Sequence, residues 1–219
     1  MNQKEHLVKI ERTARYFTLG NLTPETQTIW FVFHGYGQLA SFFIKKFDGI
    51  VDQNTFVVAP EGISRFYLDE KYQRVGASWT TREHNDLESI EYIDFINGIY
   101  HNLIDSSIHS NIKINVLGFS QGCATALRWL NSCDFIPDKL ILWAGFFNKG
   151  ISGLIDPRKL KTVDTYYVYG LQDEFLIQYP DMTEAFKEKM KEEINPKIIS
   201  FEGKHRVDEV QLKALIDSW

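Results

Sequence analysis

A serine flanked by glycines is the clearest candidate for covalent chemistry in this sequence. The string GFSQG has the pattern G-x-S-x-G and puts Ser120 where, within residues 112–130, an alternating β-branched stretch gives way to helical spacing. A serine raised between a strand end and a helix start has a strained backbone, and small glycines leave room around it. The pattern favours Ser120 as a nucleophile over a plain structural turn. The Gln121 N–H, in the first turn of the helix, is a candidate oxyanion donor.

A serine hydroxyl is a poor nucleophile until a base removes its proton, and the base needs an acid to orient it. In an open parallel sheet, functional side chains collect beyond the carboxyl ends of the strands. Asp173 follows the apolar stretch at residues 165–170, and His205 follows the stretch at residues 197–201. The order Ser120, Asp173, His205 is the order of triad partners on an α/β-hydrolase sheet.

Each of these residues has a competitor. Glu174 is an alternative acid beside Asp173, and Asp173 alone could be an ordinary turn aspartate. His34 is an alternative base, but a histidine that leads a glycine-rich loop more often fixes the loop by hydrogen bonds. His205, taken alone, could be a surface loop residue.

A second oxyanion donor is predicted in the glycine-rich turn HGYGQ. This turn follows residues 28–33 (TIWFVF), which are almost wholly apolar, as expected for a strand buried on both faces of a sheet. Such a turn lets backbone amides approach a ligand closely. The Tyr36 N–H is the predicted donor, and a plain strand-to-helix turn is the alternative.

The elements that must position these residues alternate between strand and helix along the chain. Apolar β-prone runs at residues 28–33, 54–60, 112–117, 139–147, 165–170 and 197–201 are separated by helical patterns. This order predicts a mostly parallel central sheet with helices on both faces. Residues 6–19 are predicted to form an antiparallel edge hairpin. A long helix from about residue 83 is predicted to bury one stripe, made by Ile90, Ile93, Ile96, Ile99, Tyr100 and Leu103.

Two irregular segments, residues 63–81 and 148–164, are candidates for a small cap. The first is rich in aromatic residues and lacks a clean period, and long irregular segments in compact domains are often functional. Trp79 and Phe66 are predicted to wall the substrate site. The alternative is an aromatic loop that covers the core.

Length and composition fit one domain spanning residues 1–219. The net charge of −5 and the scattered Lys and Arg residues exclude a basic nucleic-acid surface. The charged N-terminus and the lack of a long apolar run predict a cytoplasmic protein without stable membrane insertion. Two cysteines, Cys123 and Cys133, are too few for a disulfide framework and lack metal-type spacing.

The chain resembles the phospholipase/carboxylesterase family of α/β hydrolases, relatives of the acyl-protein thioesterases and dienelactone hydrolases. The matching pieces are FHGYG, VVAPEG, SWTT, GFSQG, YGLQDEF and GKH. The resemblance implies Ser120 as nucleophile, His205 as base and Asp173 as its acid. It also implies the amides of Tyr36 and Gln121 as the oxyanion hole.

The sequence departs from the family pattern at two positions. Cys123 stands where the family usually has glycine, and Thr80 stands where an aromatic residue usually follows the tryptophan. The first change predicts tighter packing under the serine turn. The second leaves the identity of the acyl-pocket wall open.

The predicted function is that of a serine hydrolase that cleaves small or medium carboxylic esters through an acyl-enzyme. The alternatives are an acyl-protein or small-molecule thioesterase or lysophospholipase, an amidase, and a catalytically idle hydrolase fold that serves as a binding module. No metal or organic cofactor is implied. A small-molecule ester is the predicted partner, and the sequence makes no prediction of oligomeric state.

Overall fold

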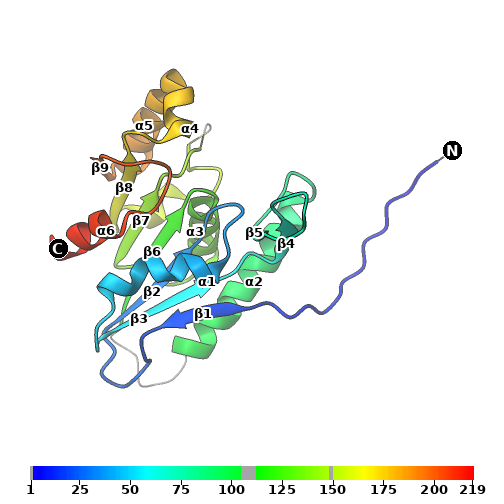
Figure 1. Cartoon of the computed structure of the whole chain (residues 1–219), viewed down its shortest axis with the longest axis horizontal. Helices are drawn as coiled ribbons and strands as arrows, with labels where there is room; N and C mark the ends of the chain where they lie inside the picture. The colour runs from blue at the N-terminus through cyan, green and yellow to red at the C-terminus, as the bar shows by residue number, and fades with distance from the viewer. Residues whose placement is uncertain (1, 105–111, 148–149) are drawn as a thin grey trace.

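A seven-stranded sheet forms the centre of the structure (Figure 1). The computed structural model describes residues 2–104, 112–147 and 150–219. The strands of this sheet are β1 (Tyr16–Leu19), β2 (Thr28–Phe33), β3 (Thr55–Pro60), β6 (Lys113–Phe119), β7 (Lys139–Trp143), β8 (Asp164–Gly170) and β9 (Lys197–Phe201). Their order is β1-β3-β2-β6-β7-β8-β9, and only β1 runs antiparallel to its neighbour. The carboxyl ends of the six parallel strands therefore meet at one edge.

Helices cover both faces of the sheet, as the sequence predicts. One face carries α2 (Asn85–Ile104), α3 (Gln121–Ser132) and α5 (Pro180–Ile194), and the other carries α1 (Ala40–Phe43), the 3₁₀ helix η1 (Ile44–Ile50) and α6 (Glu209–Asp217). Strand β2 shows why its sequence is continuously apolar. Phe31 and Phe33 pack into the first layer, whereas Trp30 and Val32 pack into the second.

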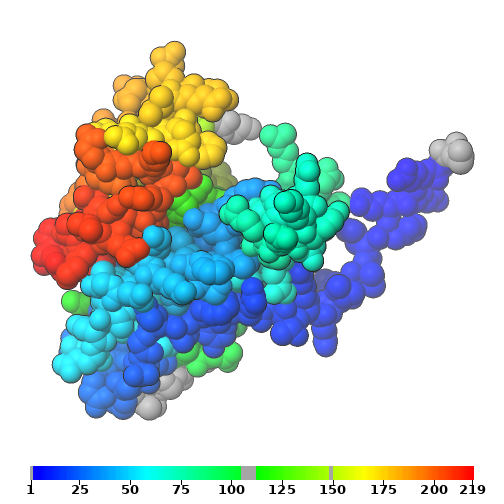
Figure 2. All heavy atoms as spheres, in the orientation of Figure 1, coloured from blue at the N-terminus to red at the C-terminus, as the bar shows by residue number. Residues whose placement is uncertain are grey.

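The first candidate cap segment is an ordered antiparallel hairpin. Within residues 63–81, β4 (Ser64–Tyr67) pairs with β5 (Val75–Ser78). In Figure 2 this teal hairpin projects from the body on one side, and the yellow region of α5 and the short helix α4 (Glu174–Gln178) projects on another. The second candidate segment contains the 3₁₀ helix η2 (Pro157–Leu160), and its residues 148 and 149 lie outside the described part of the chain.

The predicted N-terminal hairpin is wrong. Only β1 forms, and the preceding residues run away from the body as an extended arm (Figure 1). Leu7, Val8 and Ile10 are exposed, so this stretch has no buried face that would hold it as a strand. An ion pair of 2.7 Å between Arg15 Nε and Glu61 Oε1 marks where the chain joins the sheet.

The predicted apolar stripe of the long helix is correct in its middle and wrong at its start. Ile96 and Ile99 are buried, whereas Ile90 is 57% exposed and Tyr92 is buried in its place. The Tyr92 ring meets the edge of Trp79 at a centroid distance of 5.8 Å. Packing against Trp79 therefore sets which side of the first turns faces inward.

Candidate active site

Ser120 sits in a strained turn between β6 and α3. Its backbone has φ 51° and ψ −117°, a conformation that residues other than glycine rarely adopt. A Cβ on Gly118 would lie 2.5 Å from Cys123 Cα, so the turn requires glycine there. The Ser120 N–H donates to the carbonyl of Trp143 at 2.9 Å, which ties the turn to β7. The residues that border Ser120 thus hold its hydroxyl out at the carboxyl edge of the sheet.

Three side chains from three strand ends form one hydrogen-bonded row. His205 Nε2 lies 3.0 Å from Ser120 Oγ, and His205 Nδ1 lies 2.7 Å from Asp173 Oδ2. The Asp173 carboxylate is completely buried, whereas Glu174 is exposed. A carboxylate accepts only, so the Nδ1–H of His205 donates to Asp173 and leaves Nε2 free to accept the serine proton. This arrangement can activate a hydroxyl for attack on an acyl carbon.

The imidazole of His205 contacts two aromatic rings. Phe119 lies at a centroid distance of 5.0 Å and Phe175 at 4.7 Å. Phe175 is also the residue whose N–H donates to Asp173 Oδ1 at 3.0 Å, at the start of α4. The same carboxylate therefore orients the imidazole and caps the helix that packs on it.

Two backbone amides near Ser120 have no acceptor among the described residues. They are the N–H groups of Tyr36, in the loop after β2, and of Gln121, the first residue of α3. The loop approaches the serine closely, because a Cβ on Gly35 would lie 3.2 Å from Ser120 Cβ. Unpaired amides beside the row of side chains can stabilise an oxyanion.

His34 holds this loop rather than acting as a base. It is fully buried, its Nδ1 lies 2.8 Å from the carbonyl of Gly35, and its Nε2 accepts from the Gly62 N–H at 2.9 Å. Burial lowers the pKa of His34 to about 4, outweighing the raising effects of the Gly35 carbonyl and of Glu61. The imidazole is therefore neutral at neutral pH, with its proton on Nδ1.

Trp79 and Phe66 lie elsewhere than the sequence predicts. Trp79 is completely buried, donates from Nε1 to the carbonyl of His34 at 2.9 Å and stacks on the His34 ring at 4.9 Å. Phe66 stacks on the Tyr36 ring at 5.0 Å. Neither lines the cavity beside Ser120. The prediction that they wall this cavity is wrong, because their apolar area supports the Tyr36 loop instead.

The Gln121 side chain connects the hairpin to the serine turn. Its Oε1 accepts from the Trp79 N–H at 3.2 Å, and its Nε2 donates to the Thr80 carbonyl at 2.9 Å. Thr80 takes part through its backbone, so the residue that departs from the family pattern is not a wall of the cavity.

A cavity of about 440 Å³ opens beside Ser120 and His205, on the side of α4 and α5. Its walls are mostly apolar and aromatic, and they include Ala124, Phe146, Phe147, Phe175, Leu176, Tyr179 and Met182. The sequence alone did not predict these walls. The one signal for them is the apolar run at residues 175–177, shortly after Asp173. In the structure Phe175 and Tyr179 are 57% and 49% exposed. Exposed aromatics beside a strand end suit a binding site.

Cys123 is packed under the serine turn, as the sequence predicts. It is completely buried, and its thiol donates to the Gly118 carbonyl at 2.9 Å. Burial raises its pKa, so the thiol stays protonated. Across the described residues, no three His, Cys, Asp or Glu side chains are grouped so that they could hold a metal ion. No helix in the described ranges is long and apolar enough to cross a membrane.

Comparison with known proteins places this chain in a family. The model of the phospholipase/carboxylesterase family matches residues 18–218. No curated protein matches the chain.

Solved structures with the same fold cover most of the chain. Acyl-protein thioesterase 2 of Zea mays is 14% identical, with a TM-score of 0.67 over 94% of this chain and 97% of its own. A carboxylesterase from Mesorhizobium loti is 16% identical, with a TM-score of 0.64 over 94% and 95%. SOBER1 of Arabidopsis thaliana is 15% identical, with a TM-score of 0.63 over 89% and 97%. The chain therefore has the α/β-hydrolase fold and belongs to the phospholipase/carboxylesterase family.

Proposed function

We propose that this protein is a serine hydrolase that cleaves carboxylic esters of small or medium acyl groups. The observation that carries the proposal is the row Ser120 Oγ to His205 Nε2 at 3.0 Å and His205 Nδ1 to Asp173 Oδ2 at 2.7 Å. The strained backbone of Ser120 and the two unpaired amides beside it add support. The natural substrate would be a small-molecule ester.

In the first half of the reaction, Ser120 Oγ attacks the acyl carbon while His205 Nε2 takes its proton. The carbonyl oxygen becomes an oxyanion, which accepts hydrogen bonds from the N–H groups of Tyr36 and Gln121. As the bond to the leaving oxygen breaks, His205 gives its proton to that oxygen. The products of this half are a free alcohol and an acyl-enzyme on Ser120.

In the second half, His205 takes a proton from a water molecule that attacks the acyl-enzyme. Collapse of the second tetrahedral intermediate returns the proton to Ser120 Oγ and releases the carboxylic acid. Asp173 stabilises the imidazolium in both halves without itself being protonated. A thioester would react through the same steps with a thiol as leaving group.

The test is labelling by a fluorophosphonate together with hydrolysis of p-nitrophenyl butyrate. We expect one label per chain, on Ser120. We expect the Ser120→Ala variant to fold but neither to react with the fluorophosphonate nor to hydrolyse the ester. Ser132→Ala is the matched control, because Ser132 lies at the exposed far end of the same helix. Labelling at another residue, or full activity in Ser120→Ala, would overturn the proposal.

A further inference from the structure

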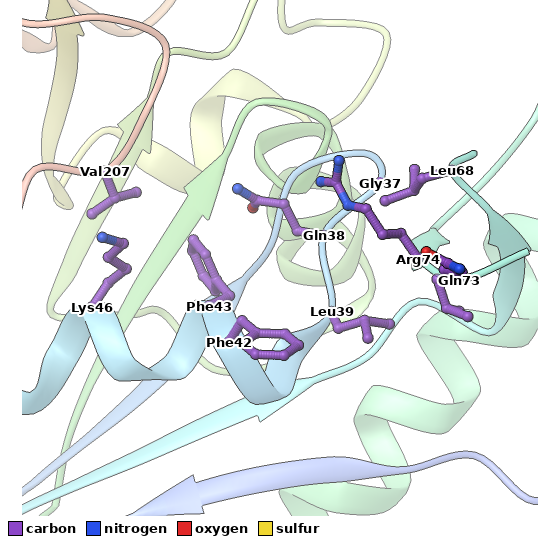
Figure 3. A pocket seen from close by; sticks show the side chains of 11 residues that line it. Gly37, Gln38, Leu39, Phe42, Phe43, Lys46, Leu68, Gln73, Arg74 and Val207 are labelled. Atoms are coloured by element: carbon purple, nitrogen blue, oxygen red, sulfur yellow. The ribbon is translucent and has the colours of Figure 1, made fainter. Parts of the chain in front are cut away.

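A second cavity, of about 640 Å³, lies between the Tyr36 loop, α1, η1, the β4–β5 hairpin and the segment after His205 (Figure 3). We refer to it as the hairpin groove. Phe43 and Val207 form its buried floor, and Phe42 lies exposed at its rim. Its lining contains neither Ser120 nor any residue of α4 or α5, so it is distinct from the cavity beside Ser120.

The hairpin groove is nevertheless built on the elements that carry the reacting groups. Gln38, in its lining, is two residues after Tyr36, and Val207 is two residues after His205. The Phe43 ring stacks on Phe119 at 6.2 Å, and Phe119 in turn contacts the His205 imidazole. The groove thus borders the oxyanion loop and the segment that follows the base, whereas the first cavity is lined by α4 and α5.

This placement matters because a tetrahedral intermediate directs its substituents apart. With the oxyanion on the Tyr36 and Gln121 amides and the acyl chain in the cavity of α4 and α5, the leaving oxygen must stay within reach of His205 Nε2. The body of the leaving group then extends away from α4. The hairpin groove is lined by residues that follow Tyr36 and His205 and by none of α4, as a site for that part of the substrate requires.

Two cations lie toward opposite ends of the groove (Figure 3). Lys46 is already paired, because its Nζ lies 2.8 Å from Glu209 Oε1. The Arg74 guanidinium is different: within the described residues it makes no hydrogen bond or close ion pair, and the Asp69 carboxylate of its own turn attracts it only from a longer distance. It extends toward Gln38 over the groove in Figure 3.

The turn that carries Arg74 is fixed by its own hydrogen bonds. The Asp69 carboxylate accepts from the backbone N–H groups of Lys71, Gln73 and Arg74 at 2.7 to 3.1 Å. The Arg74 carbonyl accepts from the Leu68 N–H at 2.8 Å. The backbone at Arg74 is therefore held in place before any ligand binds, which lowers the entropic cost of using its side chain.

We propose that the hairpin groove binds the leaving group of the substrate, an alcohol or thiol with an apolar body and a terminal carboxylate or phosphate. The apolar body lies on Phe42 and Phe43, and the anion pairs with the Arg74 guanidinium, whose planar donors match either anion. The chain carries a net charge of −5, so this cation is a local feature and not part of a general basic surface. The inference rests on the proposed function and names the substrate class for that site.

The experiment compares two esters that share an acyl group. We would measure kcat/KM for 3-(4-carboxyphenyl)propyl butyrate and for its neutral primary carboxamide analogue. We expect the wild-type protein to prefer the carboxylate by about tenfold, the value of one charge-assisted hydrogen bond. Because Arg74 is exposed, the preference should shrink as salt is added. The value of kcat/KM for the analogue that carries a phosphate in place of the carboxylate shows which anion the protein prefers.

Variants assign the preference to one residue. Arg74→Gln should remove the preference by lowering kcat/KM for the carboxylate ester about tenfold more than for the carboxamide, and Arg74→Lys should keep part of the preference. Arg82→Gln is the matched control, since Arg82 is an exposed arginine outside the groove lining, and it should keep the full preference.

The outcomes separate this inference from the function on which it rests. Hydrolysis of p-nitrophenyl butyrate without any preference for the carboxylate would overturn the groove assignment alone. A preference that survives in Arg74→Gln would do the same. If the wild-type protein neither hydrolyses any of these esters nor reacts with the fluorophosphonate, both proposals are overturned.

Discussion

His34 Nε2 accepts a hydrogen bond from the backbone N–H of Gly62 at 2.9 Å, which joins the loop after β2 to the segment after β3. A protonated imidazole cannot accept this bond. Since the ring is also fully buried, its charged form is excluded from the folded state until the pH is low. The loop that carries Tyr36 is thus supported by a histidine that must remain neutral.

This relationship predicts a loss of stability in mild acid. In the unfolded chain His34 takes up a proton near its ordinary pKa of 6.5, whereas in the folded protein it does so near about 4. The unfolded state binds more protons between these values, so stability is highest above pH 6.5 and falls as the pH drops toward 4. The predicted loss from this group is about 3 kcal/mol by pH 4, from about 1.4 kcal/mol per pKa unit, and about 2 kcal/mol of it falls between pH 7.5 and 5. Urea unfolding at pH 7.5 and 5 measures it.

A site-specific measurement separates His34 from the other titrating groups. We expect its imidazole NMR signal to stay constant from pH 8 to 5.5. His84→Gln is a suitable control variant, because it removes a different histidine. The Glu5 carboxylate raises the pKa of His84, so its shift is opposite to that of His34. A His34 signal that titrates near pH 6.5 would refute the prediction.

The second prediction distinguishes the two neighbouring carboxylates. Asp173→Asn keeps an oxygen that can cap α4, but its amide cannot stabilise an imidazolium. We expect kcat to fall about 10⁴-fold, by analogy with other serine triads, with little loss of stability. Glu174 is an exposed neighbour, and Glu174→Gln should change kcat by less than about threefold. Equal effects of the two substitutions on p-nitrophenyl butyrate turnover would contradict the assignment.

The third prediction concerns acyl-chain length. Ala124 lines the cavity beside Ser120 from α3, and Ala124→Leu would fill part of it. We expect kcat/KM for p-nitrophenyl hexanoate to fall at least about tenfold, since one methylene in an apolar pocket changes discrimination by about that much. Acetate should be nearly unaffected. Ser132→Leu places the same side chain at the exposed end of α3 and should leave both rates intact.

The same cavity predicts the range of acyl groups. Because its volume of about 440 Å³ is bounded by side chains of α3, α4, α5 and the end of β7, we expect kcat/KM to peak between acetate and hexanoate. Laurate and palmitate esters should react more slowly. A continuous rise to palmitate, measured below the micelle threshold, would show that the acyl chain leaves the cavity and binds elsewhere.

The fourth prediction tests the packing under the serine turn. A Cβ on Gly145 would lie 2.7 Å from Cys123 Sγ, so Gly145→Ala should destabilise the fold by about 1 to 3 kcal/mol. Cys123→Gly removes this obstacle and should recover part of the loss in the double variant. The recovery is partial because Phe147 also crowds the site at 2.9 Å. Additive effects of the two substitutions on urea unfolding would contradict the contact.

The sequence was informative wherever chemistry demands a particular residue at a strand end. Ser120, Asp173 and His205 each follow a parallel strand, and the fold brings such positions to one edge. Local pattern therefore predicted a long-range arrangement, in which the serine meets a histidine 85 positions further along the chain. The strand TIWFVF was predictable for a related reason, since a strand buried on both faces admits almost no polar residue.

The apolar walls could not be predicted in the same way. A sequence does not distinguish an aromatic side chain that packs in the core from one that faces a substrate. Trp79 was therefore assigned to the substrate site, and Phe175 was not. The difference arises from tertiary contacts: the Trp79 indole is buried and donates to the His34 carbonyl, whereas the Phe175 ring stays 57% exposed beside His205. Nor does local alternation distinguish a strand from an extended arm, as Leu7 and Val8 illustrate.

The double use of Asp173 constrains how this enzyme can be redesigned. One oxygen of its carboxylate accepts from the His205 Nδ1–H, and the other accepts from the N–H of Phe175, a residue that lines the cavity beside Ser120. An engineer who rebuilds α4 to change this cavity therefore also disturbs the residue that orients His205. Selection for altered chain length should accordingly accumulate substitutions on α3 and α5, which contribute Ala124 and Met182, and should spare the first turn of α4.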